Sequence, residues 1–142
     1  MKTELLFPTP IWQDDCDIEL DPIAEFAYKV KEEDKEGRRS SNAGGGWQSR
    51  DFRTDWIPNT PLKPVYDRIM INAYECADDF GFKDYRLKMS NMWININGRG
   101  AYNHTHIHGG SMFSGVFYVK VPSCCCGELK FLRPLEFQAM KE

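Results

Sequence analysis

The hydrophobic pattern changes its period near Gly81, and this change limits the folds open to the chain. Before Gly81, apolar residues recur every three to four positions, which is the spacing of an amphipathic helix. After it, apolar and polar residues alternate, as in a strand with one buried face. Helices followed by antiparallel strands predict an α+β domain, mainly β, or a β-barrel backed by helices.

Two helices are predicted in the first half of the chain. Asp21 is expected as the N-cap of the first helix, with Pro22 at its first position and Gly37 beyond its end. The second helix opens after Asn59-Thr60-Pro61 and stops at Gly81. The apolar stripes are Ile23, Phe26, Ala27 and Val30 in the first helix, and Leu62, Val65, Tyr66, Ile69, Ala73, Cys76, Ala77 and Phe80 in the second.

Strands are predicted over 90–97, 112–121 and 128–132, after a polar glycine-rich loop over 38–46 and a short strand within 47–56. The alternation over 90–97 places Met92, Ile94 and Ile96 on one face, and Asn91, Trp93, Asn95 and Asn97 on the other. Three strands cannot close a barrel, and an open sheet leaves its edges exposed. Open sheet edges favour a dimer or a larger homo-oligomer.

Length and composition narrow the class of protein. A chain of 142 residues fits one domain, which we place over 1–142, with a helical part over about 1–85 and a β part over about 86–142. The formal charge of −3 argues against a nucleic-acid binder. The chain shows no secretory signal and no apolar run near the ~20 residues of a membrane helix, so a cytoplasmic protein with no membrane partner is expected.

All three histidines lie within His104-Thr105-His106-Ile107-His108. In an extended chain, positions two apart are about 6.6 Å apart and positions four apart about 13 Å, at ~3.3 Å per residue. Two nitrogens on one metal ion must lie within roughly 3–4 Å of each other, given bonds of ~2.1 Å. The spacing therefore lets His106 with His108, or His104 with His106, bind one ion. The alternative is a polar loop whose histidines hydrogen-bond locally.

The cysteines are a second, weaker set of candidate metal ligands. There are five, an odd number, and three are consecutive at Cys124, Cys125 and Cys126. Adjacent cysteines pair poorly in disulfides, so a reducing compartment is expected. The triplet is either a thiolate source for zinc or a turn after a strand, and its spacing is not that of a zinc motif. Imidazole and carboxylate ligands with open positions suit Fe(II) instead.

Several stretches together resemble a 2-oxoglutarate/Fe(II) oxygenase family found in marine bacteria and cyanophages, from about residue 5 to about residue 132. The specific part is the block from His106 through Ser114-Gly115-Val116 to Val119. The other stretches are Leu6-Phe7-Pro8-Thr9-Pro10-Ile11-Trp12, Gly46-Trp47-Gln48-Ser49, Trp93-Ile94-Asn95-Ile96-Asn97 and Tyr102-Asn103.

The resemblance implies a double-stranded β-helix, which is a jelly-roll or cupin-like barrel backed by the N-terminal helices, and a hydroxylase-type dioxygenase. Measured against that fold, we expect a barrel that lacks its C-terminal strands. Such an enzyme binds iron through two histidines and a carboxylate, leaving positions for 2-oxoglutarate and O₂. His106 falls on the first ligand position and His108 on that of the acid, with His104 as a weaker candidate. The implied substrate is a small molecule or peptide, in the host cytoplasm if the protein is phage-encoded. Candidates for cosubstrate binding are Asn95, Asn103, Ser114 and Tyr118.

Three departures from the family pattern keep alternatives open. Position 108 is His instead of Asp or Glu, and Gly109 stands where the family usually has Pro. No His follows His108, and Arg133 comes too early to pair with the far carboxylate of 2-oxoglutarate. The alternatives are a non-catalytic jelly-roll domain for binding or phage assembly, and a three-histidine, cupin-like metal site that does not use 2-oxoglutarate.

Overall fold

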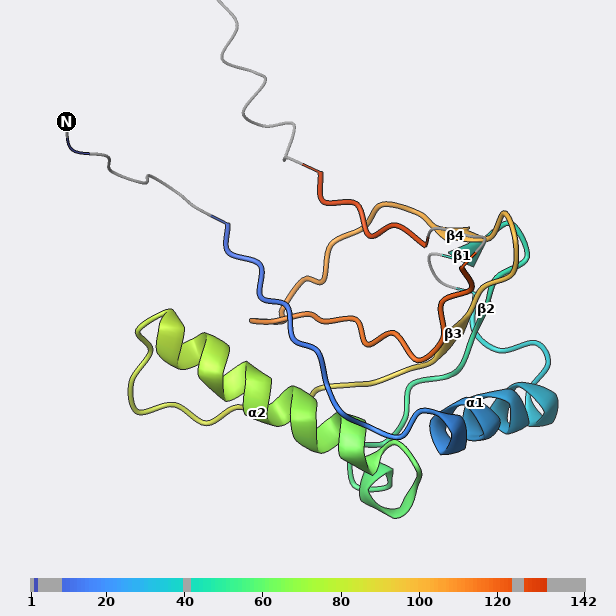
Figure 1. Cartoon of the computed structure of the whole chain (residues 1–142), viewed down its shortest axis with the longest axis horizontal. Coiled ribbons are helices and arrows are strands. Elements are labelled where there is room, and N and C mark those ends of the chain that lie inside the picture. The colour runs from blue at the N-terminus through green and yellow to red at the C-terminus, as the bar shows by residue number, and fades with distance from the viewer. Residues whose placement is uncertain (1, 3–8, 40–41, 124–126, 133–142) are drawn as a thin grey trace, which may run out of the picture.

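In the part of the chain that the structure describes, two α-helices, a 3-10 helix and one interrupted β-ribbon make up the regular structure (Figure 1). The computed structural model describes residues 2, 9–39, 42–123 and 127–132. Its elements are, in chain order, α1 (Asp21–Glu33), β1 (Asn42–Ala43), β2 (Trp47–Gln48), the 3-10 helix η1 (Ile57–Asn59), α2 (Lys63–Asp79), β3 (Asn95–Ile96) and β4 (Tyr102–Asn103).

Both predicted helices are confirmed, and the start of α1 needs a correction. Leu20 occupies the N-cap position with no side-chain cap, so the prediction of Asp21 as N-cap is wrong. Asp21 instead lies in the first turn, where its negative charge interacts favourably with the positive end of the helix dipole. α2 ends before Gly81, whose φ of +80° suits glycine. Neither helix among the described residues has the length and apolar character that crossing a bilayer requires.

The core lies where α1, η1 and α2 meet. Its buried cluster consists of Ile23, Ile57, Leu62 and Val65. The extended segments around 89–94 and 117–119 cover this cluster with Met89, Met92, Ile94, Phe117 and Val119. The N-terminal parts of the two helical stripes therefore face the core, together with Met92 and Ile94 of the apolar face predicted over 90–97, whereas Phe80 at the end of the second stripe is 52% exposed.

The strands form one antiparallel ribbon between 42–52 and 92–103. β2 pairs with β3, with Trp47 opposite Ile96, and β1 pairs with β4, with Asn42 opposite Asn103. The pairing continues beyond β2, because Ser49 N donates to Ile94 O at 2.9 Å and Phe52 N donates to Met92 O at 2.8 Å. The short strand predicted within 47–56 is confirmed, and β1 lies inside the region predicted as a loop.

Glycines allow the ribbon to continue across its interruption. Between the two paired stretches, residues 44–46 face the longer segment 97–101. A Cβ added at Gly44 would overlap the carbonyl oxygen of Gly100, and one at Gly46 would overlap Oδ1 of Asn97. At Gly44 the backbones of the two segments therefore approach at a distance that only glycine permits, whereas the contact at Gly46 is with a side chain that can move.

The strands predicted over 112–121 and 128–132 are wrong for the described residues, and the strand over 90–97 shrinks to β3. A strand needs a neighbour for its N–H and C=O groups, and the described residues of these two segments have none. The alternation itself survives, because Phe117 and Val119 pack on the core while Tyr118 between them is exposed. The jelly-roll barrel stays a prediction.

The segment before α1 is attached to α2 by polar contacts. Arg68 Nε donates to Asp14 Oδ2 at 2.7 Å, and Asn72 Nδ2 donates to the same oxygen at 2.9 Å. These hydrogen bonds, that of Arg68 first, hold the pKa of Asp14 well below its usual range. Nearby, Trp12 Nε1 donates to Asp79 Oδ2 at 2.8 Å.

Alanine at Gly44 and at Gly45 separates backbone strain from close contact. Both glycines have positive φ, +65° and +84°, so alanine at either position lowers the free energy of unfolding by about 1–2 kcal/mol through the left-handed conformation alone. Only the Cβ at position 44 also displaces Gly100, since nothing lies within 4 Å of a Cβ at Gly45. We expect Gly44→Ala to lower the urea midpoint further than Gly45→Ala does. Equal midpoints would contradict the close approach.

The Asp14–Arg68 pair predicts a pH-dependent stability. The folded pKa of Asp14 lies below the unfolded value of about 3.9, so the pair stabilises the fold at neutral pH. That contribution is lost as the pH falls below about 4 towards the folded pKa. We expect Asp14→Asn to lower the melting temperature at pH 7, with a difference from wild type that shrinks in acid. The exposed neighbour Asp15→Asn is the control, and a pH-independent difference for Asp14→Asn would contradict the pairing.

Candidate functional site

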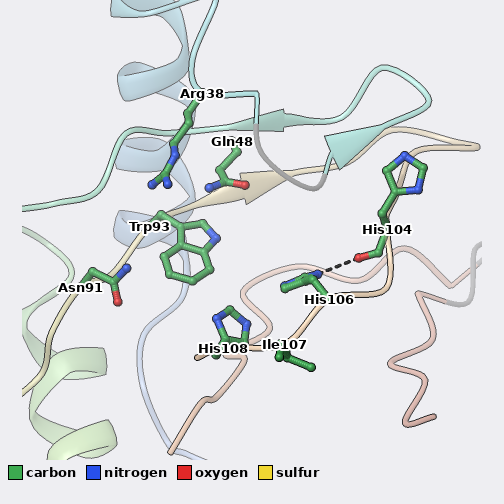
Figure 2. A pocket seen from close by; sticks show the side chains of 8 residues that line it. All are labelled: Arg38, Gln48, Asn91, Trp93, His104, His106, Ile107 and His108. Atoms are coloured by element: carbon green, nitrogen blue, oxygen red, sulfur yellow. Dashed lines mark hydrogen bonds between the residues drawn. The ribbon is translucent and has the colours of Figure 1, made fainter. Parts of the chain in front are cut away.

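A pocket of about 430 Å³ lies between the ribbon and the histidine segment (Figure 2). Its volume is within the range of about 300–1,000 Å³ that small-molecule sites occupy. We call Arg38, Gln48, Asn91 and Trp93 the ribbon wall, and His104, His106, Ile107 and His108 the histidine wall. The ribbon wall itself joins distant parts of the sequence, because pairing of β2 with β3 places the segment that carries Gln48 beside the segment that carries Trp93.

The histidine wall places two of the three imidazoles side by side. The ring centroids of His106 and His108 are 4.8 Å apart, with the rings edge-on at 75°. The ring of His104 instead packs edge-on against Tyr102, with centroids 5.2 Å apart. Of the two pairs that the sequence left open, the structure brings together the rings of His106 and His108. Their role as metal ligands stays a prediction.

A backbone contact fixes the orientation of His106. Its Nδ1 lies 2.6 Å from the carbonyl oxygen of His104 (dashed in Figure 2). A carbonyl oxygen only accepts hydrogen bonds, so Nδ1 of the neutral ring carries the proton and donates. Nε2 then keeps its lone pair. Metal-binding histidines commonly show this arrangement, in which one nitrogen donates to a carbonyl and the other binds the metal.

The donor set fits part of an iron site. Two adjacent imidazoles match the histidine ligands of an Fe(II) centre with two histidines and one carboxylate. Within the described ranges, no group of three or more His, Cys, Asp or Glu side chains is placed to bind one ion. The described residues therefore offer two candidate ligands, His106 and His108, and no third side chain of these types beside them. Arg133 and the triplet Cys124, Cys125 and Cys126 lie outside the described residues.

Trp93 brings the ribbon wall into contact with the histidine wall. Its ring centroid lies 5.8 Å from that of His108, with the planes tilted by 31°. Trp93 belongs to the polar face predicted over 90–97, and it lines the pocket together with Asn91. The pocket therefore lies against the part of that face nearest α2 in the sequence, before β3 begins.

The four candidates for cosubstrate binding lie outside the pocket lining. Asn95 is exposed on β3, and Ser114 and Tyr118 are exposed beyond the histidine wall. Asn103 pairs across the ribbon, since its Nδ2 donates to Asn42 Oδ1 at 2.6 Å and its Oδ1 accepts from Asn97 Nδ2 at 3.3 Å. These contacts give Asn103 a role in joining β1 to β4.

Sequence reasoning missed Arg38 and Gln48 as pocket residues. Arg38 N donates to Gln48 O at 2.8 Å, so the two residues are neighbours across the start of the ribbon. Arg38 Nη1 also donates to Asp51 Oδ1 at 2.6 Å. Two features of the sequence could have indicated them. One is Gly37, a glycine just before Arg38 that adopts a φ of +59° and turns the chain there. The other is the stretch Gly46–Ser49, which contains Gln48 and carries part of the family resemblance.

Asp34 attaches the end of α1 to the ribbon beside the pocket. Its backbone oxygen accepts from Trp47 Nε1 at 2.8 Å. Its carboxylate accepts from Gly37 N and from Arg50 Nε, each at 3.0 Å. The hydrogen bond from Gly37, followed by that from Arg50, lowers the pKa of Asp34. These contacts fix the turn that delivers Arg38 to the pocket.

Comparison with known proteins gives one match. Residues 91–142 match the family model described as "Putative 2OG-Fe(II) oxygenase". That range contains Trp93 and all three histidines, whereas Arg38 and Gln48 lie before it. The resemblance expected from about residue 5 onward is therefore supported only for the C-terminal part of the chain. No curated protein and no solved structure matches the chain.

The contact between His106 and His104 predicts a tautomer that can be measured without any metal. We expect His106 to carry its proton on Nδ1 in the neutral state, because Nδ1 faces a carbonyl oxygen at 2.6 Å. Long-range ¹H–¹⁵N correlation of the imidazoles in alkaline solution reports this directly. Neutral histidines in solution favour the Nε2–H form, so that form at His106 would contradict the contact.

Proposed function

We propose that this chain is a non-haem Fe(II)-dependent oxygenase that uses 2-oxoglutarate and hydroxylates its substrate. The observation that carries the proposal is the pair of rings at His106 and His108, adjacent on a pocket wall and within the segment that matches an oxygenase family. We extend the proposal to a jelly-roll barrel around this pocket and to a cytoplasmic protein of a marine bacterium or its phage.

The roles of the histidine wall follow from its contacts. His106 would bind iron through Nε2, because its Nδ1 is engaged by the carbonyl of His104. His108 would be the second ligand, and its neutral imidazole leaves the metal with one negative charge fewer than an aspartate or glutamate would. Bound iron, 2-oxoglutarate and O₂ together supply the oxidation, while the protein orients the reactants and shields them.

The remaining pocket residues set what can enter. The indole of Trp93 covers one side of His108 and limits the access of water there. Ile107 is 91% exposed at the pocket edge, so an apolar surface lies beside the entrance. A small molecule or a peptide side chain fits the volume of about 430 Å³.

An anaerobic titration tests the assignment. The metal-free protein receives Fe(II) and then 2-oxoglutarate, and the metal-to-ligand charge-transfer band is followed. We expect a band at one iron per chain, lost in His106→Ala and in His108→Ala. His104→Ala is the matched control. It should keep the band, because the backbone carbonyl that contacts His106 remains and the ring of His104 points towards Tyr102.

Each failure has a distinct meaning. Iron binding with no response to 2-oxoglutarate would replace the proposal with a cupin-like metal site. Neither iron binding nor a band would leave a non-catalytic domain. A band that survives in His106→Ala but disappears in His104→Ala would show that the ligands have been assigned to the wrong histidines.

A further inference from the structure

On the ribbon wall, the side-chain amide of Gln48 is open to the pocket. Gln48 is only 4% exposed, and its backbone pairs with Asn95 and Arg38. Its side-chain amide makes no hydrogen bond to any other residue that the structure describes. Figure 2 shows this amide directed into the pocket. The buried side-chain atoms that lack a hydrogen bond in the described residues are Asn42 Nδ2 and Asn72 Oδ1, so the Gln48 amide is instead open to the pocket and free to contact a ligand there.

Arg38 places a cation beside that amide. Both residues line the pocket, and Figure 2 shows the guanidinium and the Gln48 amide each directed towards the ring of Trp93. The backbone hydrogen bond between Arg38 N and Gln48 O fixes this arrangement. Of the five guanidinium N–H donors, the Nη1 contact with Asp51 Oδ1 uses one. The rest are not used by any contact within the described part of the chain.

The groups around Arg38 favour a ligand with a single negative charge. Asp51 neutralises part of the charge of Arg38, and Asn91 Nδ2 contacts the other oxygen of Asp51 at 3.5 Å. The Arg38 side chain is 46% exposed and pairs on one side with Asp51, and its remaining donors suit a carboxylate, which accepts parallel hydrogen bonds in one plane. The indole of Trp93 offers a flat apolar surface for the rest of such a ligand.

We propose that Arg38 and Gln48 form a carboxylate-binding subsite for the primary substrate. That substrate is a small carboxylic acid with an apolar or aromatic body lying on Trp93. The inference rests on the proposed function, because it directs the far end of the acid towards His106 and His108 on the opposite wall. 2-Oxoglutarate carries the same carboxylate chemistry, so the test must separate the two sources.

The test uses the full chain without metal and two matched probes, phenylacetate and its neutral analogue phenylacetamide. Calorimetric titration of the wild type should show tighter binding of phenylacetate. Arg38→Gln should weaken phenylacetate at least about tenfold, the effect of one lost charge-assisted contact. Arg39→Gln, the same charge change at the next residue and outside the pocket lining, should leave it unchanged. Undetectable binding to the wild type, or equal losses in both variants, would overturn the subsite.

A second variant separates ligand binding from folding. Gln48→Leu keeps a similar volume and removes an amide that has no partner, so the melting temperature should be unchanged or higher. Phenylacetate affinity should still fall. A lower melting temperature together with unchanged affinity would assign Gln48 a structural role and overturn the proposal.

Two further measurements isolate this inference from the oxygenase assignment. Arg38→Gln should keep the Fe(II) and 2-oxoglutarate band, since Arg38 is on the wall opposite the histidines, and loss of the band would overturn the assignment to the primary substrate. Saturating 2-oxoglutarate that displaces phenylacetate from the metal-free protein would do the same, because the cosubstrate would then occupy the subsite. Wild-type protein that binds phenylacetate through Arg38 but shows no band would refute the oxygenase and leave the carboxylate subsite intact.

Discussion

Ser49 and Ile94 are joined by two hydrogen bonds, and both faces of the ribbon depend on them. Ser49 N donates to Ile94 O, and Ile94 N donates to Ser49 Oγ, each at 2.9 Å. Ser49 is 2% exposed, so these polar contacts are made away from water, where an unmatched partner is costly. The neighbours of this pair are Gln48 on one strand and Trp93 on the other. The same two bonds therefore hold Ile94 on the core and align the ribbon wall of the pocket.

Local periodicity predicted the helices and the buried face at Met92 and Ile94, because that information lies within a few residues of each position. It did not predict which extended segments become strands. Alternation reports which side chains turn towards the core, as at Phe117 and Val119, but a strand also needs a second chain beside it. At the start of α1, Pro22 correctly marked the first turn of the helix. The N-cap was misplaced by one residue, because Leu20 takes that position without a side-chain cap and Asp21 lies in the first turn.

The histidine cluster was visible in the sequence because all its members lie within five positions, and the structure brings the rings of His106 and His108 together. The opposite wall could not be read in the same way. Arg38 and Gln48 reach the pocket only through a backbone bond to each other and through pairing with a segment nearly fifty residues away. The interpretation of Asn95 as a pocket residue used the correct face of its segment, but the cavity lies beside Asn91 and Trp93, at the beginning of that face.

The long sequence separation of the ribbon has a consequence for how the molecule assembles. Ser49 and Ile94 are 45 residues apart, and Asn42 and Asn103 are 61 apart. Closing a loop of that length costs chain entropy before any contact repays it, whereas α2, which lies inside the loop, forms from local contacts. Helix formation shortens the span that the flexible chain must cover. We therefore expect the helices to form early and the ribbon late, so that the two walls of the pocket meet near the end of folding and a ligand that touches both would slow their separation.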